Sequence, residues 1–284
     1  MGKIIDGKAL GLSIREEIKQ SVKELKLKGI IPKLVVVLVG NDSASQVYVR
    51  NKEKGCLDVG IESQTYNFPS NIKEKELIVL IEKLNSDKAV HGVLVQLPLP
   101  KEIDEKKVLS KILPEKDVDG FHIENIGKLF RGETPLFLPC TPRGIMELIL
   151  STGISLEGKE AVVVGRSNIV GKPMAMLLLD ANCTVTVCHS RTKDLGMVVR
   201  RGDVVVAAVG QARLISGDMI KQGAIVIDVG MNRIDGKLCG DVDFDSAKEK
   251  AAYITPVPGG VGPMTIAMLL KSVLESANRG MIAG

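Results

Sequence analysis

Short apolar runs alternate with helical patterns along most of this chain. The runs are rich in Val and Ile and almost wholly apolar, as in LVVVLVG at 34–40, which predicts strands buried on both faces. Between them, apolar residues recur at helical spacing, as in the helix expected over 6–28, with Asp6 as its cap and Gly29 as its stop. The other predicted strands cover 63–68, 90–96, 161–165, 184–190, 203–210 and 224–230, and the other predicted helices cover 43–58, 72–84, 170–181 and 264–278, with one more capped by Thr141.

This rhythm is interrupted at 99–140, where short helices and loops are expected. Buried strands that alternate with helices predict parallel sheets covered by helices on both faces. We therefore expect an α/β fold with two domains: an N-terminal α/β catalytic domain over 1–140 and a Rossmann-type nucleotide-binding domain with a parallel sheet over 141–265. The pattern alone allows the last helix to pack on either domain.

The composition indicates a globular protein with an aliphatic core. Hydrophobic residues make up 45% of the chain and aromatic residues 3%, without any Trp. The net charge of +4 comes from basic residues mixed with acidic ones, so no nucleic-acid partner is expected. Five Cys without a CxxC pair favour reduced thiols over disulfides or a zinc site. Neither a signal peptide nor a run of the ~20 apolar residues that span a bilayer is present, so we expect a cytoplasmic protein without a membrane partner.

The clearest nucleotide-binding signal is the sequence AVVVGRSNIVGKP at 161–173. It predicts a strand, a glycine turn and a helix whose N-terminus attracts a pyrophosphate. Gly165 permits the turn, and Gly171 permits close contact between helix and strand. Ser167 replaces the second glycine of G-x-G-x-x-G, and glycines between a strand and a helix often only make a turn.

The end of the next strand favours NADP over NAD. NAD-preferring folds usually place an acid there to bind the ribose 2′-hydroxyl, whereas this chain has Cys-His-Ser-Arg at 188–191. Arg166 in the phosphate turn, together with Ser190 and Arg191, would suit a 2′-phosphate. Both arginines could equally be ordinary surface residues.

Candidates for chemistry stand in the N-terminal half. Tyr48 and Lys52 are four residues apart and share a helix face, where the ring could stack on a flat ligand and the amine could transfer protons. Such a pair is more often a solvated surface pair. Gln96 ends a buried strand, where ligands bind in open α/β sheets, although a cap on the backbone is also possible.

Three acidic or glycine-rich segments are expected to form turns or loops. Asp117 and Asp119 could form a turn, or one could accept hydrogen bonds from an amidine-like edge of a ligand; no metal site is expected. The similar DVD at 241–243 is interpreted as a turn. The segment TPVPGGVGPMT at 255–265 is interpreted as a rigid loop before the last helix, of the kind that lines ligand clefts.

Seven motifs, in order along residues 4–278, resemble those of the bifunctional methylenetetrahydrofolate dehydrogenase/methenyltetrahydrofolate cyclohydrolase family: YVRNK, LVQLPLP, PEKDVDGFH, PCTP, VVGRSNIVGKP, CHSRT and TPVPGGVGPMT. The resemblance implies that Lys52 is catalytic, that Tyr48 stacks on the folate rings, that Gln96 partners the lysine and that Asp119 binds the pterin. It further implies a substrate cleft lined by Val95, Gln96, Leu97, Pro258, Gly259, Gly260, Val261 and Gly262, and NADP contacts from Gly165, Arg166, Ser167, Ser190 and Met231.

The resemblance also implies a homodimer, tetrahydrofolate derivatives as substrates, and a last helix, 266–284, that returns to the N-terminal domain. The activity it implies is NADP-dependent oxidation of 5,10-methylenetetrahydrofolate and hydrolysis of the product to 10-formyltetrahydrofolate, in the one-carbon metabolism that serves purine and amino-acid biosynthesis.

Three alternatives stay open. One is another two-domain NADP dehydrogenase, such as a shikimate-type enzyme, which the tyrosine beside Lys52 disfavours. Another is a silent nucleotide-binding sensor, which intact Lys52, Gln96 and Asp119 disfavour. The third is a member with one activity, which the presence of both the lysine and the nucleotide loop disfavours.

Overall fold

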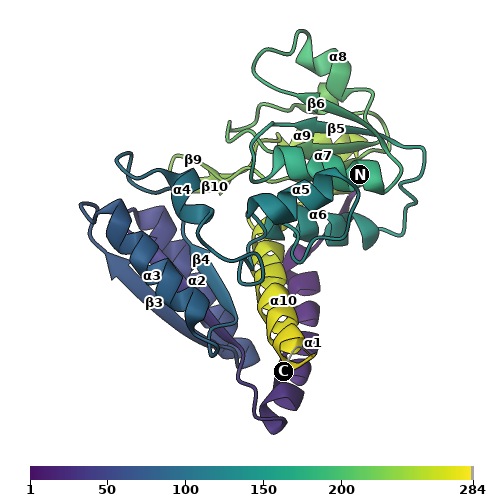
Figure 1. Cartoon of the computed structure of the whole chain (residues 1–284). Helices are drawn as coiled ribbons and strands as arrows, with labels where there is room; N and C mark the ends of the chain where they lie inside the picture. Colours follow the sequence, from purple (N-terminus) through teal and green to yellow (C-terminus); the bar gives the residue numbers. More distant parts are fainter. Residues whose placement is uncertain (283–284) are drawn as a thin grey trace. The chain divides into compact units, whose positions relative to one another are not determined.

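The computed structural model describes residues 1–282, which form two compact α/β units. Unit 1 contains Met1–Gly11, Leu129–Gly132 and Thr141–Thr265, and unit 2 contains Leu12–Lys128, Glu133–Cys140 and the chain from Ile266 onward. The predicted α/β class with a parallel sheet is confirmed (Figure 1). The domain limits at residues 140 and 265 stay a prediction.

Unit 2 is built on a three-stranded parallel sheet in the order β3-β2-β4. β2 (Lys33–Val39) lies between β3 (Glu62–Phe68) and β4 (Gly92–Val95), and its residues from Leu34 onward are buried, as its apolar pattern predicts. β4 begins two residues later than expected because the N–H of Val90 turns back to the carbonyl of Asp87, at 3.1 Å.

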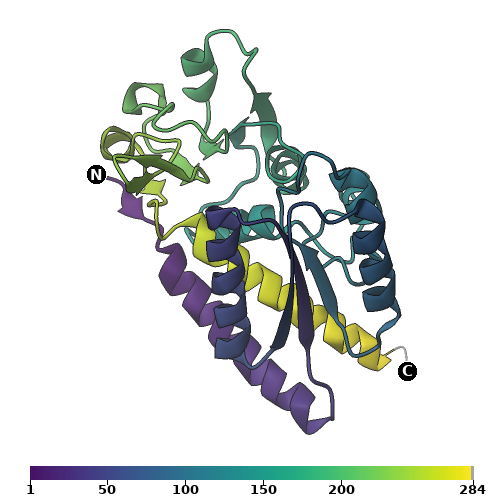
Figure 2. The same cartoon turned by 90° about the vertical axis from the view of Figure 1, so that its left-hand side faces the viewer.

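Helices cover both faces of this sheet. α3 (Glu74–Ser86) packs on one face through Leu77, Ile81 and Leu84, in a core that includes alternate residues of β2. α2 (Ser43–Val59) lies on the other face (Figure 2), where Gly55 faces Leu270 of α10 (Val261–Ile282). Asp42 caps α2 by accepting from the N–H of Ser45 at 2.7 Å. The cap fixes the first turn of the helix that carries Tyr48 and Lys52.

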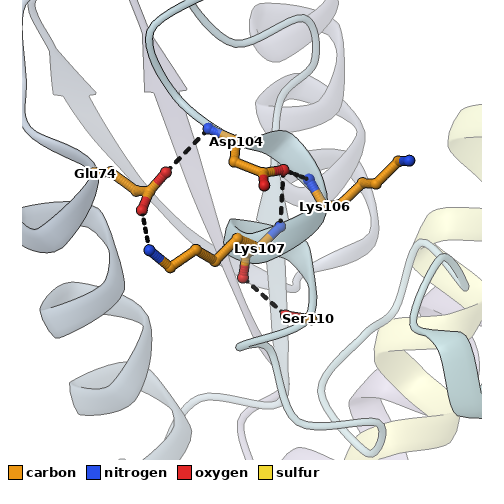
Figure 3. A network of polar contacts seen from close by, with 5 residues as sticks. All are labelled: Glu74, Asp104, Lys106, Lys107 and Ser110. Atoms are coloured by element: carbon orange, nitrogen blue, oxygen red, sulfur yellow. Dashed lines mark hydrogen bonds and ion pairs between the residues drawn. The ribbon is translucent and has the colours of Figure 1, made fainter.

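A polar network joins the starts of α3 and α4 (Glu105–Leu109), as Figure 3 shows. Glu74 accepts from the backbone N–H of Asp104, at 3.0 Å, and from the amine of Lys107. The carboxylate of Asp104 caps α4 by accepting from the N–H groups of Lys106 and Lys107. The network therefore fixes the loop that follows β4.

The two long helices confirm one sequence expectation and correct another. α1 (Gly7–Leu27) is capped by Asp6, whose Oδ1 accepts from the N–H of Ala9 at 2.9 Å, as predicted. The expectation that residues 255–265 form only a loop was wrong from Val261 onward, where α10 begins. Pro263 falls in the first turn of α10, where the proline nitrogen has no helical hydrogen bond to lose.

The C-terminal part of α10 belongs to unit 2. Ser276 Oγ donates to the carbonyl of Glu115 at 3.1 Å, and Arg279 donates to the carbonyl of Leu136 at 2.7 Å. Residues 283–284 of the expected helix 266–284 lie outside the described residues. Along residues 1–282, no helix is both long enough and apolar enough to cross a membrane.

Unit 1 contains a six-stranded parallel sheet in the order β1-β11-β8-β7-β5-β6. Its strands are β1 (Lys3–Ile4), β11 (Tyr253–Ile254), β8 (Ile225–Asp228), β7 (Val204–Ala207), β5 (Glu160–Val164) and β6 (Thr184–Cys188). β7 and β8 are shorter than predicted because the backbone after each strand binds a buried carboxylate. The N–H of Val209, after β7, donates to Asp241, and the N–H of Gly230, after β8, donates to Asp228. β1 and β11 have two residues each, too few to show a pattern.

Unit 1 also contains several short elements: α6 (Cys140–Leu150), α7 (Gly171–Asp180), α8 (Leu195–Val199), α9 (Phe244–Lys250), a 3-10 turn η1 (Gly217–Met219), and a hairpin of β9 (Asn232–Ile234) and β10 (Lys237–Cys239). Most of α5 (Ile123–Phe130), earlier in the chain, belongs to unit 2. Thr141 does not precede α6 as its cap, because the helix begins at Cys140. Its hydroxyl instead shares a 3.0 Å hydrogen bond with the hydroxyl of Thr265.

Candidate active site

Lys52 and Gln96 meet within unit 2. Lys52 is 8% exposed, and its Nζ donates to Gln96 Oε1 at 2.9 Å. The Gln96 side-chain amide in turn donates to the carbonyl of Leu97 at 2.7 Å, which fixes the amide with its oxygen toward the amine. Burial lowers the pKa of the Lys52 amine, an effect that the Asp119 carboxylate opposes. This arrangement favours an amine that gives up its proton more readily than an exposed lysine does.

Tyr48 lies one helical turn before Lys52 on α2. It is half-buried, and burial raises the pKa of its phenol, so the ring stays neutral at physiological pH. A neutral, partly exposed ring is suited to stacking on a flat ligand. Stacking by Tyr48 stays a prediction.

The two aspartates of the acidic loop between α4 and α5 have different surroundings. Asp117 is buried, and its carboxylate accepts from the N–H groups of Phe121 and His122 at 3.1 and 2.7 Å, and from Asn125 Nδ2 at 2.9 Å. Burial raises the pKa of Asp117 to about 6. Asp119 is only partly buried, so it is the carboxylate that the loop leaves open to a ligand.

Two apolar candidates flank Gln96. Val95 is buried in the core that contains Val37 and Leu99, and Leu97 packs partly against the same core. The substrate contacts expected of Val95 and Leu97 stay predictions.

The predicted substrate loop lies in unit 1. Thr255 is fully buried, and its hydroxyl accepts from the N–H of Asp228 at 2.8 Å, while the carbonyl of Gly259 accepts from the N–H of Lys8 at 3.0 Å. Gly259 has a φ of +109°, which favours glycine. The loop is therefore fixed at both ends. The substrate roles expected of Pro258, Gly259, Gly260, Val261 and Gly262 stay predictions.

The glycine turn after β5 lies at the switch point of the six-stranded sheet. The chain continues from β5 to β6 on one side, whereas β7 pairs on the other, and ligands of such sheets bind in the crevice between these strand ends. A Cβ at Gly165 would collide with the carbonyl of Ala208, and a Cβ at Gly171 would collide with the carbonyl of Gly165. Gly171 therefore allows the start of α7 to approach the end of β5 closely, as expected, and Gly165 allows the turn to pass close to the chain after β7.

Ser167 holds the turn and retains a donor. Its Oγ accepts from the N–H groups of Val170 and Gly171 at 3.2 and 3.3 Å, so the hydroxyl proton is left to bind a phosphate oxygen. Arg166 and Ser167 are exposed. Ser190 and Met231 are also exposed, beyond the ends of β6 and β8, respectively. The NADP contacts expected of these residues stay predictions.

A second polar cluster, in unit 1, was missed by the sequence analysis. Asp228 and Asp241 are 3% and 0% exposed, and backbone N–H groups surround their carboxylates. The interpretation of 241–243 as a plain turn was wrong for Asp241, because its side chain is buried and accepts hydrogen bonds from other segments. One signal was available: Asp228 ends the apolar strand β8, as Gln96 follows β4.

A pocket of about 490 Å³ opens on another face of α2. Gln46, Arg50 and Glu53 line it, and their spacing places them on a different side of the helix from Tyr48 and Lys52. The pocket is thus separate from the Lys52 amine. Within the described part of the chain, no three His, Cys, Asp or Glu residues are grouped so that they could hold a metal ion.

Comparison with known proteins gives matches over almost the whole chain. The family model "Tetrahydrofolate dehydrogenase/cyclohydrolase, catalytic domain" matches residues 5–119, and "Tetrahydrofolate dehydrogenase/cyclohydrolase, NAD(P)-binding domain" matches residues 139–281. The bifunctional protein FolD of Magnetococcus marinus is 59% identical, over 98% of each chain.

Solved structures agree with these matches. The bifunctional methylenetetrahydrofolate dehydrogenase/cyclohydrolase FolD of Campylobacter jejuni is 52% identical with a TM-score of 0.97, covering 98% of this chain and 99% of that one. The Trypanosoma brucei dehydrogenase-cyclohydrolase, solved with NADP and an inhibitor, is 42% identical with a TM-score of 0.95, covering 99% and 98%.

Proposed function

This chain belongs to the tetrahydrofolate dehydrogenase/cyclohydrolase family, and on that premise we propose that it oxidises 5,10-methylenetetrahydrofolate with NADP and hydrolyses the resulting methenyl compound to 10-formyltetrahydrofolate. The observation that carries the proposal is the buried Lys52 amine, held by Gln96 at 2.9 Å. It provides the proton-transfer group that the hydrolytic step needs, and the glycine turn of unit 1 provides a dinucleotide site for the oxidation.

The residues of unit 1 fit a dinucleotide. The turn after β5 has glycines at the two positions of closest approach, and the start of α7 supplies backbone N–H groups and the positive end of a helix dipole. Arg166 and Ser190 would bind a 2′-phosphate, and Gly165, Ser167 and Met231 would complete the site. NADP bound here would supply the hydride acceptor for the oxidation.

Oxidation asks for positioning more than for acid–base chemistry. The substrate carbon lies between two nitrogens, whose lone pairs stabilise the cation that remains after hydride loss. The chain must therefore hold the folate in a fixed pose, which can lower the barrier by several kcal/mol, on the order of 7 in favourable cases. We assign this task to Tyr48, which would stack on the ring system, and to Asp119, which would accept from the pterin N–H edge. Val95, Leu97 and residues 258–262 would line the substrate.

Hydrolysis asks for proton transfer at the attacking water and at N5. A water oxygen attacks the cationic methenyl carbon and loses one proton to the neutral amine of Lys52. The protonated amine gives this proton to N5 as the bond from the carbon to N5 breaks, the remaining hydroxyl proton is lost to solvent, and the formyl group stays on N10. One proton is therefore released to solvent for each substrate hydrolysed. Gln96 keeps the amine oriented through its hydrogen bond, and the burial that lowers the pKa of Lys52 increases the share of neutral amine.

The test follows both products in one reaction. Protein is mixed with 5,10-methylenetetrahydrofolate and NADP, and the absorbances of NADPH and of methenyltetrahydrofolate are recorded together. NADPH formation without lasting methenyltetrahydrofolate supports both activities. Accumulating methenyltetrahydrofolate would contradict the hydrolase, and a reaction without NADPH would contradict the dehydrogenase. The same assay with NAD tests the expected preference for NADP.

The assembly and location belong to the same proposal. We infer a homodimer and a cytoplasmic location from the family resemblance, and five cysteines that are thiols rather than disulfides suit a reducing compartment. Light scattering on the purified protein should give twice the chain mass, and a monomeric mass would contradict the dimer. Fractionation of cells tests the location, which recovery with membranes would contradict.

The domain limits are a further proposal: a folate-binding domain over 1–140 with the last helix, and an NADP-binding domain over 141–265. Limited proteolysis should cut first near these limits. First cuts within β2 or β5 would contradict them.

A further inference from the structure

We propose that Asp241, whose backbone is held by Asp228, is a positioning residue for NADP. Asp241 fixes the backbone after β7 through hydrogen bonds, and so sets the affinity for the dinucleotide without touching it. The inference rests on the proposed function and adds residues that no motif assigned to it. Every contact that carries it lies within unit 1.

Asp241 holds the chain that follows β7. Its Oδ2 accepts from the N–H groups of Val209 and Gly210 at 2.6 and 3.0 Å, and its Oδ1 accepts from the N–H of Gln211 at 2.8 Å. Three consecutive backbone donors thus converge on one carboxylate. Because β7 is the neighbour of β5 at the switch point, this segment borders the crevice where dinucleotides bind in such sheets.

The segment is exposed on one side and anchored on the other. Asp241 is 0% exposed, whereas Gly210 and Gln211 are exposed. Gly165 of the phosphate turn lies against the carbonyl of Ala208, immediately before the anchored residues. A shift of residues 209–211 would therefore also displace the phosphate turn.

Asp241 also reaches the segment that follows β8. Its Oδ1 accepts from Asn232 Nδ2 at 2.9 Å, directly after Met231, a predicted NADP contact. Gly230 passes so close to the Asp241 carboxylate that a Cβ there would collide with it. One carboxylate thus binds the segments that follow the two adjacent strands β7 and β8. These segments lie at the carboxyl ends of the parallel strands, as the glycine turn after β5 does.

Asp228 holds Asp241 in turn. Its carboxylate accepts from the N–H groups of Gly230, Asp241 and Val242 at 3.0, 2.8 and 3.0 Å. A Cβ at Gly240 would collide with this carboxylate, so only glycine fits at this position. The two aspartates form a chain of hydrogen bonds from the end of β8 to the exposed segment after β7. Carboxylates that accept several N–H groups are strong anchors, because a neutral substitute cannot accept as many.

The test separates cofactor binding from folding by using the second activity. In Asp241→Asn, one acceptor oxygen remains and the new NH₂ faces N–H donors, so the segment after β7 loses its anchor. We expect the Kd for NADP, measured by calorimetry, to rise about tenfold or more, as expected for the loss of charged hydrogen bonds. Hydrolysis of added 5,10-methenyltetrahydrofolate, which we assign to Lys52, Gln96, Tyr48 and Asp119 of unit 2, should stay within about twofold of wild type.

Two further variants complete the design. Asp243→Asn is the matched control: its carboxylate accepts from Ser246 Oγ at 2.8 Å within the start of α9, and NADP binding should not change. Asn232→Ala removes one donor to Asp241 and keeps the carboxylate, so we expect a smaller rise in the Kd for NADP, about twofold to fivefold. If Asp241→Asn does not fold, Asn232→Ala supplies the measurement.

The outcomes are distinct. A Kd for NADP within twofold of wild type in Asp241→Asn, or an unchanged Kd in Asn232→Ala where Asp241→Asn does not fold, would overturn the proposal. Parallel loss of hydrolysis and NADP binding would also overturn it, since it would indicate a general structural role. A wild-type protein that binds NADP but does not oxidise the folate would refute the proposed function and leave the Asp241 measurement valid.

Discussion

The amine of Lys52 donates to Gln96 Oε1 at 2.9 Å, and this bond joins the middle of α2 to the chain just after β4. The two residues are 44 positions apart in the sequence. Burial lowers the pKa of this amine, which increases the share of neutral amine that can accept a proton from water. The first two predictions concern this pair.

Lys52→Met should abolish the hydrolysis of methenyltetrahydrofolate, by about 10²-fold or more, because the general base is removed while a similar volume is kept. Stopped assays of methenyltetrahydrofolate loss measure the effect, and circular dichroism checks the fold. Lys54→Met, an exposed lysine on the same helix, is the control and should hydrolyse normally. Normal hydrolysis in the Lys52 variant would disprove its role as the base.

Gln96→Glu should raise the pKa of Lys52, because a carboxylate would replace the amide 2.9 Å from the amine. Each unit of pKa gained lowers the share of neutral amine at pH 7 by about tenfold, so hydrolysis should fall at neutral pH and recover as the pH rises. The rate profile from pH 6 to 10 measures this. Gln64→Glu, at an exposed position of β3, should leave the profile unmoved. An unchanged profile in Gln96→Glu would contradict the assignment.

Asp228 makes stability depend on pH. Burial raises its pKa to about 6 from an ordinary value of 3.8. The resulting stabilisation is complete below the ordinary value and is lost as the pH rises through about 6. Asp228→Asn does not titrate, so its deficit in unfolding free energy relative to wild type should be larger at pH 5 than at pH 7.5, by roughly 1 kcal/mol. Urea denaturation at the two pH values tests this, and an equal deficit at both would contradict the raised pKa.

Arg166→Ala should weaken NADP binding much more than NAD binding, because only NADP carries the 2′-phosphate. Loss of one charged hydrogen bond corresponds to about a 10- to 100-fold rise in KM for NADP. Arg201→Ala is a suitable control, since Arg201 pairs with Glu160 at 3.3 Å at the opposite end of β5. Equal effects on the KM for both cofactors would show that Arg166 does not bind the 2′-phosphate.

Glu74→Gln should lower the stability of the fold slightly and leave both activities unchanged. Glu74 is 24% exposed in its side chain and pairs with Lys107, which is 55% exposed, so the ion pair is worth at most about 1 kcal/mol (Figure 3). Thermal unfolding of the variant and of Lys106→Gln, a lysine of α4 whose amine is outside this ion pair, provides the comparison. A loss of activity would mean that the network shapes the site after β4.

The regular elements were predictable where the apolar pattern was long. β2 shows this, because its buried residues from Leu34 onward stand in one run, and so does α1, whose Asp6 cap is visible in the sequence. The start of α10 was not predictable from composition, since Gly262 and Pro263 disfavour helices in general but are tolerated in a first turn. β11 was missed because a strand of two residues is too short to show an alternating pattern.

Part of the candidate site followed from local rules. Helix spacing placed Lys52 beside Tyr48, and the end of a strand placed Gln96. The roles of Asp117 and Asp119 were not separable, because the choice depends on the N–H groups of Phe121 and His122, which fold back onto Asp117. Asp241 was missed for the same reason: its donors come from segments about 30 residues earlier in the chain.

The parallel pairing of β1 with β11 makes the sheet of unit 1 depend on the order of synthesis. Lys3 and Ile4 are made well before their partners Tyr253 and Ile254, which follow after most of the described chain. At about 5–20 residues per second, this interval lasts roughly 10–50 s. β2, β3 and β4 of unit 2 lie within residues 33–95 and can pair early. The sheet of unit 1 can therefore be completed only after β11 has been made, through a contact of very high sequence separation.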